Sequence, residues 1–170
     1  MKAITLIAMT FFSLKSFAGP LAQYYITEGK LHKGGKASVE VLENSEEKYT
    51  VKLTYELYKK ILVPIPSDEL KGESVLDFPA EFRDERGYME LESIGSMELP
   101  KATLKFVKRI NWENLPDAYQ FLILPKNGKS KIDIIYHPSV KAAGWAKILI
   151  TFVSSTPILN GYQVEIFLNK

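Results

Sequence analysis

Two histidines are the only side chains of the sequence that can act as bases near neutral pH, and the chain contains no cysteine. Residues 72–76, the nearest approach to a serine nucleophile elbow, lack its second glycine. His32 and His137 are too far apart for an H-x-H or H-x-x-x-H zinc motif, and cysteine-ligated metals are excluded. The sequence therefore favours a protein that is not an enzyme, and it predicts no metal and no cofactor. We expect His32 at the solvated surface and His137 on an exposed loop.

Aromatic side chains are a second feature that could bind a partner, because tyrosine and tryptophan combine a large apolar face with a polar tip. Tyr58 lies off the apolar face of its predicted strand, and Trp112 and Trp145 lie in loop-like segments. We predict these three as binding residues at a surface or pocket. Other tyrosines fall on apolar strand faces and are expected in the core: Tyr49, Tyr55 and Tyr162.

Charge is distributed unevenly along the chain. Residues 67–98 hold ten acids against three bases, a local charge of −7, whereas residues 99–170 have a local charge of +6. Either the two regions lie together and form exposed ion pairs, or the acidic segment attracts a basic partner surface through its field. For the second case the predicted binding residues are Asp77, Glu81, Asp84 and Glu85.

These side chains must be positioned mainly by β-strands. Apolar and polar residues alternate without a break from Tyr49 to Leu57, and nearly so from Tyr162 to Leu168, so each segment predicts a strand with one buried face. Residues 148–153 are apolar on both faces, which is typical of a central strand. Further strands are expected at residues 38–41, 104–108 and 132–134.

Turn signals separate these segments. Gly34-Gly35, Asn127-Gly128 and Asn160-Gly161 tolerate the positive φ that two-residue hairpins require. The polar residues 43–46 and 84–87 predict two longer turns. Helical signals are restricted to short turns, at residues 67–70 and 111–115 and within the loop-like residues 138–144.

The fold class follows from these patterns. We predict a single all-β domain over residues 19–170, an antiparallel sandwich or barrel of about nine to eleven strands with little helix. Prolines between residues 61 and 97 interrupt the succession of hairpins and indicate edge strands or a crossover. This interruption slightly favours the sandwich over the barrel. No segment of the sequence predicts a helix of three turns or more.

The N-terminal segment, residues 1–18, is predicted to be a signal peptide. Lys2 precedes an apolar stretch from Ala3 to Leu14, and Ser16-Phe17-Ala18 has the small-x-small pattern of a cleavage site. Cleavage after Ala18 removes two lysines and no acid, which leaves 20 bases and 20 acids. The stretch is shorter than the roughly 20 residues that span a bilayer. We therefore predict a periplasmic or secreted protein without a transmembrane segment in the mature chain.

The balance of charge and the absence of cysteine narrow the function classes. A neutral mature chain lacks the basic footprint that favours nucleic-acid binding, and a disulfide-free exported domain suits the bacterial periplasm. The favoured hypothesis is an exported, non-enzymatic β-domain that binds an envelope protein or a surface polymer. One alternative is a lipocalin-like barrel that carries a small apolar ligand, although the G-x-W signature of lipocalins is absent. The other is a hydrolase that acts on envelope polymers.

Overall fold

The computed structural model describes residues 20–60 and 67–169, which form ten strands, one α-helix and two short 3₁₀ helices. In chain order the elements are β1 (Leu21–Ile26), β2 (His32–Asn44), β3 (Lys48–Lys59), η1 (Ser67–Leu70), β4 (Lys71–Pro79), η2 (Ala80–Arg83), α1 (Glu85–Ile94), β5 (Ser96–Glu98), β6 (Ala102–Trp112), β7 (Leu115–Pro125), β8 (Ser130–Tyr136), β9 (Trp145–Phe152) and β10 (Gln163–Leu168).

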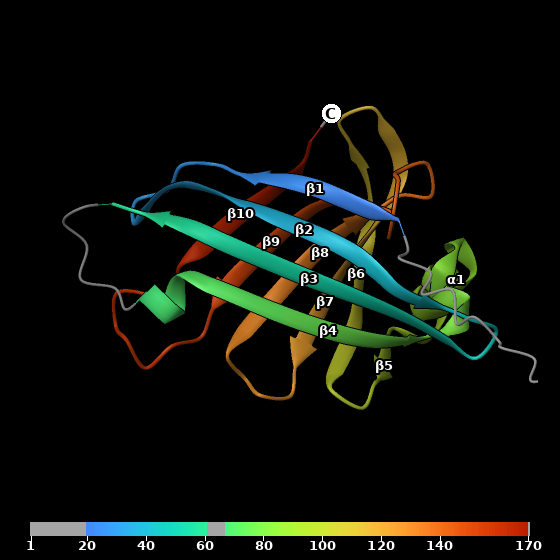
Figure 1. Cartoon of the computed structure of the whole chain (residues 1–170). Helices are drawn as coiled ribbons and strands as arrows, with labels where there is room; N and C mark the ends of the chain where they lie inside the picture. Colours follow the sequence, from blue (N-terminus) through green and yellow to red (C-terminus); the bar gives the residue numbers. More distant parts are fainter. Residues whose placement is uncertain (1–19, 61–66, 170) are drawn as a thin grey trace, which may run out of the picture.

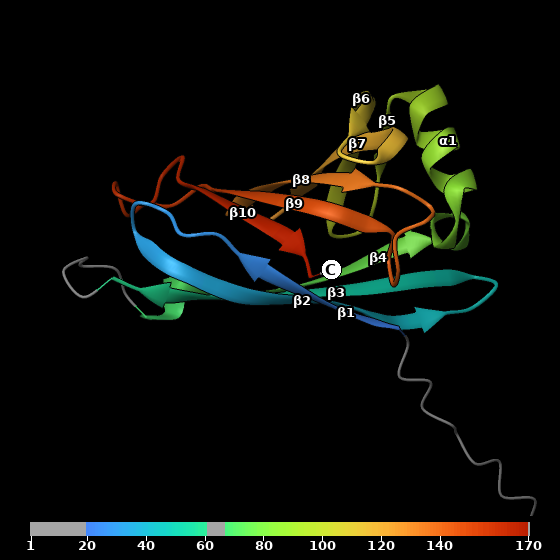
Figure 2. The same cartoon turned by 90° about the horizontal axis from the view of Figure 1, so that it is seen from above.

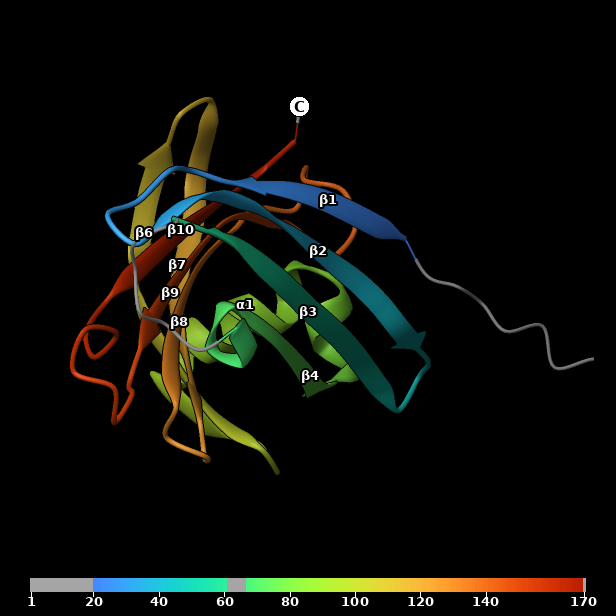
Figure 3. The ribbon, with the colours of Figure 1, turned by 60° about the vertical axis from the view of Figure 1, so that its left-hand side comes forward.

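All ten strands belong to one antiparallel sheet in the order β4-β3-β2-β1-β10-β9-β8-β7-β6-β5. The sheet curls into a half-barrel, so that β1–β4 form one wall and β7–β10 the opposite wall (Figures 1 and 2). The first and last strands, β1 and β10, pair with each other. The two edge strands, β4 and β5, do not pair, and we call this open side of the half-barrel the seam. Figure 3 shows the curvature of the sheet.

The predicted fold class is confirmed, since the protein is all-β with ten strands and 11% helix. The two-sheet sandwich that the sequence slightly favoured is not observed, because β1 pairs with both β2 and β10 and thereby joins both walls into one sheet. Of the interruption predicted between residues 61 and 97, residues 61–66 lie outside the described residues, and the remainder contains the edge strand β4, which borders the seam. Its Pro79 is the last residue of the edge strand β4, where a proline does not disturb pairing.

The predicted turns have mixed outcomes. Asn127-Gly128 forms the turn between β7 and β8, with Gly128 at a φ of 68°. Gly34-Gly35 was predicted as a hairpin turn, which is wrong because both residues lie within β2 at an irregularity of its pairing with β3. A Cβ at Gly35 would lie 2.3 Å from the carbonyl oxygen of Glu56. The glycine is therefore required by the close approach of two strands rather than by a turn.

The segment at residues 84–87, predicted as a turn, instead starts helix α1. Asp84 is the N-cap, and its carboxylate accepts a hydrogen bond of 2.9 Å from the backbone N–H of Arg86. The helix has ten residues and ends at Gly95, whose φ of 77° suits a glycine C-cap. The helical turn predicted at residues 111–115 is wrong, because these residues form the hairpin between β6 and β7.

The core between the two walls is rich in aromatic rings. The ring of Tyr88, from α1, stacks on Tyr136 at a centroid distance of 3.5 Å and contacts Phe82 and Phe121. Trp145 is fully buried, and its indole N–H donates a hydrogen bond of 3.4 Å to the Tyr88 hydroxyl. Helix α1 is therefore fixed to the sheet by a side chain that fills the interior of the half-barrel at one end.

A polar cluster fixes α1 from its outer side. Arg109 on β6 makes a bidentate ion pair with Glu92, with nitrogen–oxygen distances of 2.8 and 3.1 Å. The same guanidinium donates to the hydroxyl of Tyr119, which in turn donates to Glu85 at 2.9 Å. Burial and the hydrogen bond to Glu85 raise the pKa of Tyr119 to about 12. The phenol thus remains an O–H donor at physiological pH.

Tyr88 is expected to contribute a large share of the stability. Replacing Tyr88 by alanine should lower the free energy of unfolding by about 3–5 kcal/mol, since it opens a cavity in the aromatic cluster. Tyr88→Phe removes only the hydrogen bond to Trp145 and should cost about 1 kcal/mol. Urea denaturation measures both changes. The control is Met89→Ala at the next position of α1, where the side chain is 53% exposed. Equal losses for Tyr88→Ala and Met89→Ala would contradict this role.

Candidate binding cleft

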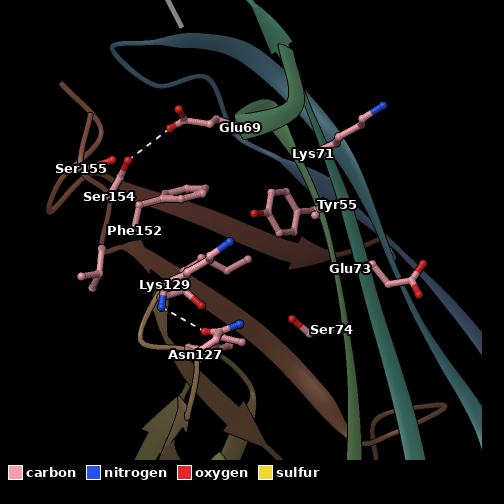
Figure 4. A pocket seen from close by; sticks show the side chains of 15 residues that line it. Tyr55, Glu69, Lys71, Glu73, Ser74, Asn127, Lys129, Phe152, Ser154 and Ser155 are labelled. Carbon is pink, nitrogen blue, oxygen red and sulfur yellow. Dashed lines mark hydrogen bonds between the residues drawn. The ribbon is translucent and has the colours of Figure 1, made fainter. Parts of the chain in front are cut away.

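An open cleft of about 520 Å³ lies on the seam, at the end of the half-barrel opposite α1. We call it the seam cleft. One wall is the N-terminal half of β4 together with Tyr55 of β3, and the other is formed by β8, β9 and the turn between β7 and β8 (Figure 4). Its volume falls within the range of small-ligand and peptide sites.

The surface of the seam cleft is partly apolar and partly polar. Ile132, Ile150 and Phe152 supply the apolar part, and the Tyr55 ring meets Phe152 edge to face at 6.1 Å. Burial raises the pKa of Tyr55, so its hydroxyl stays protonated and can donate a hydrogen bond. Polar groups come from several elements and include Glu69, Ser74, Asn127, Lys129 and Ser130. This combination suits recognition of a partner that carries both apolar and polar groups.

Side chains along β4 alternate between the cleft and the outside. Figure 4 shows Ser74 directed toward the cleft and Lys71 and Glu73 directed away from it. Glu73 forms an ion pair of 2.8 Å with Lys52 on the neighbouring strand. Gly72 leaves room for Tyr55, since a Cβ there would lie 2.5 Å from the tyrosine ring. The wall at β4 is therefore made of backbone and small side chains.

The carboxylates at the seam cleft do not converge as a catalytic pair. Glu69 accepts hydrogen bonds from Ser154 at 3.2 Å and from Thr156 at 2.9 Å, and the Glu73 carboxylate faces away. A glycoside hydrolase requires two carboxylates on either side of one bond. No histidine is among the described residues that line the cleft, and nowhere in the described part of the chain do three metal-ligating side chains form a group.

His137 contacts a serine, but the contact belongs to a surface turn. Its Nδ1 lies 2.7 Å from the Ser139 hydroxyl and also accepts the Ser139 N–H at 3.2 Å. The residues are two positions apart in the loop between β8 and β9, and neither lines the seam cleft. The geometry is that of a side chain closing a turn on its own backbone.

The three aromatic residues predicted to bind a partner lie in separate places. Trp145 is the first residue of β9 and is completely buried, so its indole is part of the core rather than of a surface loop. Tyr58 is 48% exposed near the end of β3, far from α1 (Figure 1). Trp112 is half-buried at the end of β6, and the Lys147 ammonium lies 4.9 Å from its ring centroid.

Trp112 lines a small recess of about 180 Å³ on the outer face of the sheet. Asp133 lies in this recess and accepts hydrogen bonds of 2.9 and 3.0 Å from the Gln120 amide. Burial raises the pKa of Asp133. A shallower groove of about 620 Å³ crosses the outer face of β1–β4, where Ser38 and Thr54 hydrogen-bond to each other. This groove also reaches Lys71 and Glu73 of the edge strand β4, but on the side of the strand that faces away from the seam cleft.

The acidic residues predicted as a binding segment are largely engaged within the protein. Asp77 contacts Lys48 at 3.0 Å and Lys101 at 3.6 Å. Partial burial acts to raise the pKa of Asp77, but hydrogen bonds from Lys48 and Thr50 hold it below its usual value. Asp84 caps helix α1, and Glu85 accepts the hydrogen bond from the Tyr119 hydroxyl. Glu81 is exposed on η2. These contacts favour the ion-pair interpretation of the charge pattern.

Sequence reasoning missed the residues that make the seam cleft. Tyr55 was predicted in the core, and its alternation is correct, but the ring is only half-buried because the wall opposite is open. Glu69, Ser74 and Lys129 carry no distinctive motif. Their proximity depends on the curl of the sheet, for which no local signal exists.

Comparison with known proteins adds nothing to this geometry: no family model, no curated protein and no solved structure matches the chain. Among the described helices, none is long and apolar enough to cross a membrane. The predicted signal peptide at residues 1–18 lies outside the described residues.

His32 was expected at the solvated surface, which is wrong, because it is 1% exposed. Its Nε2 donates to the Thr27 carbonyl at 2.8 Å, and its Nδ1 accepts from the Tyr162 hydroxyl at 2.8 Å. Burial lowers the pKa of His32. The neutral His32 ring therefore links Thr27, in the loop after β1, to Tyr162, the residue that precedes β10.

The burial of His32 predicts a loss of stability in mild acid. Below the ordinary histidine pKa of about 6.5, the unfolded chain takes up a proton at His32 that the folded chain excludes. The free energy of unfolding therefore falls by at most about 1.4 kcal/mol per pH unit until the pH reaches the pKa of His32 in the folded state. The free energy of unfolding, measured from pH 7.5 downward, should fall more steeply for the wild type than for His32→Gln. His137→Gln controls for the loss of a histidine as such. Parallel curves for the wild type and His32→Gln would rule the effect out.

Proposed function

We propose that this chain is an exported, non-enzymatic domain that binds an extended partner, an envelope protein or a surface polymer, in the seam cleft. The observation that carries the proposal is the position of β4. In the described part of the chain β4 pairs only with β3, and its other edge borders an open cleft of about 520 Å³. An unpaired edge beside a cleft of mixed polarity is the usual setting for an extended ligand.

The alternative of a carrier for a small apolar ligand has weaker support. Such a carrier encloses its ligand in an apolar cavity. In this protein aromatic rings, among them Tyr24, Tyr88 and Trp145, fill the space between the walls near α1. The seam cleft is open and includes the charged side chains of Glu69 and Lys129.

A hydrolase is also supported less well than a binding domain. Catalysis needs a nucleophile or a pair of carboxylates aimed at one bond. Glu69 is bonded to two hydroxyl groups at one end of the cleft, and Ser74 has no histidine beside it among the described residues. The cleft offers contacts rather than an activated group.

Site-specific crosslinking in intact cells tests the binding function. With the photoreactive residue p-benzoylphenylalanine in place of Ser74, whose side chain faces the cleft, we expect a crosslink to one envelope component. Val75 lies next to it on the same strand and faces the other side, so the same replacement there is the matched control. Protease or glycosidase treatment of the product assigns it to a protein or a polysaccharide. Identical products at both positions, or none at Ser74, would refute binding in the seam cleft.

Export is tested by the mass of the protein recovered from the cell envelope. Cleavage after Ala18 yields a chain that begins at Gly19. Ala18→Tyr places a bulky side chain where the peptidase requires a small one and should leave the precursor uncleaved. Leu21→Tyr, beyond the site, should be processed normally. A wild-type protein that retains residues 1–18 contradicts the predicted cleavage.

A further inference from the structure

We infer that the occupant of the seam cleft is a polypeptide segment that adds to the outer edge of β4 as a further strand. This inference rests on the proposed function, because it names the chemical class of the partner for the same site. Three observations carry the inference: the free backbone edge of β4, the limited exposure of the aromatic rings in the cleft, and the separate positions of an acidic and a basic side chain along the cleft.

The outer edge of β4 is regular, and the charged side chains in its N-terminal half, Lys71 and Glu73, are directed away from the cleft. Its pairing with β3 keeps one register from Lys71 to Pro79, without a bulge. Edge strands that must stay unpaired usually carry bulges, prolines or inward-pointing charges. Here the proline is the last residue, and the residues that face the cleft, Gly72 and Ser74, are small and uncharged.

The backbone of β4 supplies the hydrogen-bonding groups for such a strand. In an antiparallel pair alternate residues direct their N–H and C=O groups toward one neighbour, so half of these groups on β4 face the seam. No backbone hydrogen bond from the described residues reaches them. Another extended polypeptide matches their spacing, and β-strand addition uses the same match.

The aromatic rings of the cleft are poorly placed to stack on a sugar. Carbohydrate recognition uses open aromatic faces, whereas Phe152 is only 7% exposed and meets Tyr55 edge to face. The Tyr55 ring is half-buried, and its phenol end lies so close to Gly72 that a Cβ there would come within 2.5 Å of it. These rings form an apolar floor for alternate side chains of a bound strand, and this favours a polypeptide over a polysaccharide.

The charges of the cleft indicate which side chains the bound segment carries. Glu69 belongs to η1 at one end of the cleft, and Lys129 lies further along the cleft on the opposite wall, between Phe152 and Asn127 (Figure 4). Lys129 forms no ion pair with the described residues, and the hydrogen bonds that these residues make to Glu69 come from the neutral hydroxyls of Ser154 and Thr156. The complementary segment therefore has a basic residue at the η1 end, apolar residues in the middle and an acidic residue at the Lys129 end.

A tethered peptide tests strand addition directly. The sequence Lys-Thr-Val-Thr-Val-Thr-Glu is joined to the C-terminus of the mature chain through a flexible Gly/Ser linker of about 20 residues, which gives an effective concentration of about 1 mM. Amide hydrogen exchange is then followed by NMR. We expect exchange to slow about tenfold or more at alternate residues of β4, because added hydrogen bonds protect their N–H groups.

Two controls separate strand addition from other contacts. A tether with each Thr replaced by Pro keeps the charged and apolar side chains, but it loses the three Thr N–H donors and cannot pair as a regular strand, so it should give no protection. Lys129→Glu should reduce the protection, and changing the terminal Glu of the peptide to Lys should restore it. Equal protection with the proline tether, or none with the original, overturns the inference.

The crosslinking experiment distinguishes a failure of this inference from a failure of the proposed function. If the photoreactive residue at position 74 captures a polysaccharide while exchange in β4 is unchanged, binding in the seam cleft stands and strand addition is wrong. If it captures nothing and exchange is also unchanged, both are wrong. Capture of a polypeptide together with protection of β4 supports both.

Discussion

The burial of Tyr88 between the walls of the curled sheet is the interaction on which the rest of the structure depends. A sheet that curls without closing leaves its apolar interior open along one side, and that surface must be covered for the domain to be stable. The stacked ring of Tyr88, with Phe82 and Trp145 around it, covers one end. Because Tyr88 belongs to α1, the position of the helix and the filling of the core are determined by the same contact.

The uneven charge of the sequence is explained mainly by this architecture. The acidic residues 67–98 include the edge strand, the helix and the connection between them. Their acids meet bases from other parts of the chain, as in the pairs Asp77–Lys48 and Glu92–Arg109. Exposed pairs of this kind contribute only about 0–1 kcal/mol each. Their main effect is to offset the charge of the acidic segment locally.

The sequence predicted those features that depend on neighbouring residues. The alternation from Tyr49 to Leu57 identified β3, and Asn127-Gly128 identified a hairpin turn. Features that depend on distant contacts could not be predicted. In the sequence Gly35 resembles a turn residue, but a glycine is required at this position because the backbone carbonyl of Glu56 on β3 approaches closely. The seam cleft brings Ser74 to the same site as Phe152, and no local pattern indicates that β4 and β5 stay apart.

The connection between β4 and β5 explains why one end of the half-barrel is filled and the other open. In a closed barrel the two strands would pair along their lengths, but β5 has only three residues, whereas β4 has nine. The chain between them forms η2, which contacts β3 and β4, and α1, which packs against η2, β5 and β6. Within the described ranges, therefore, the N-terminal half of β4 has no strand paired to its outer edge. The crossover that supplies Tyr88 to the core therefore also leaves the edge at which a partner strand can be added.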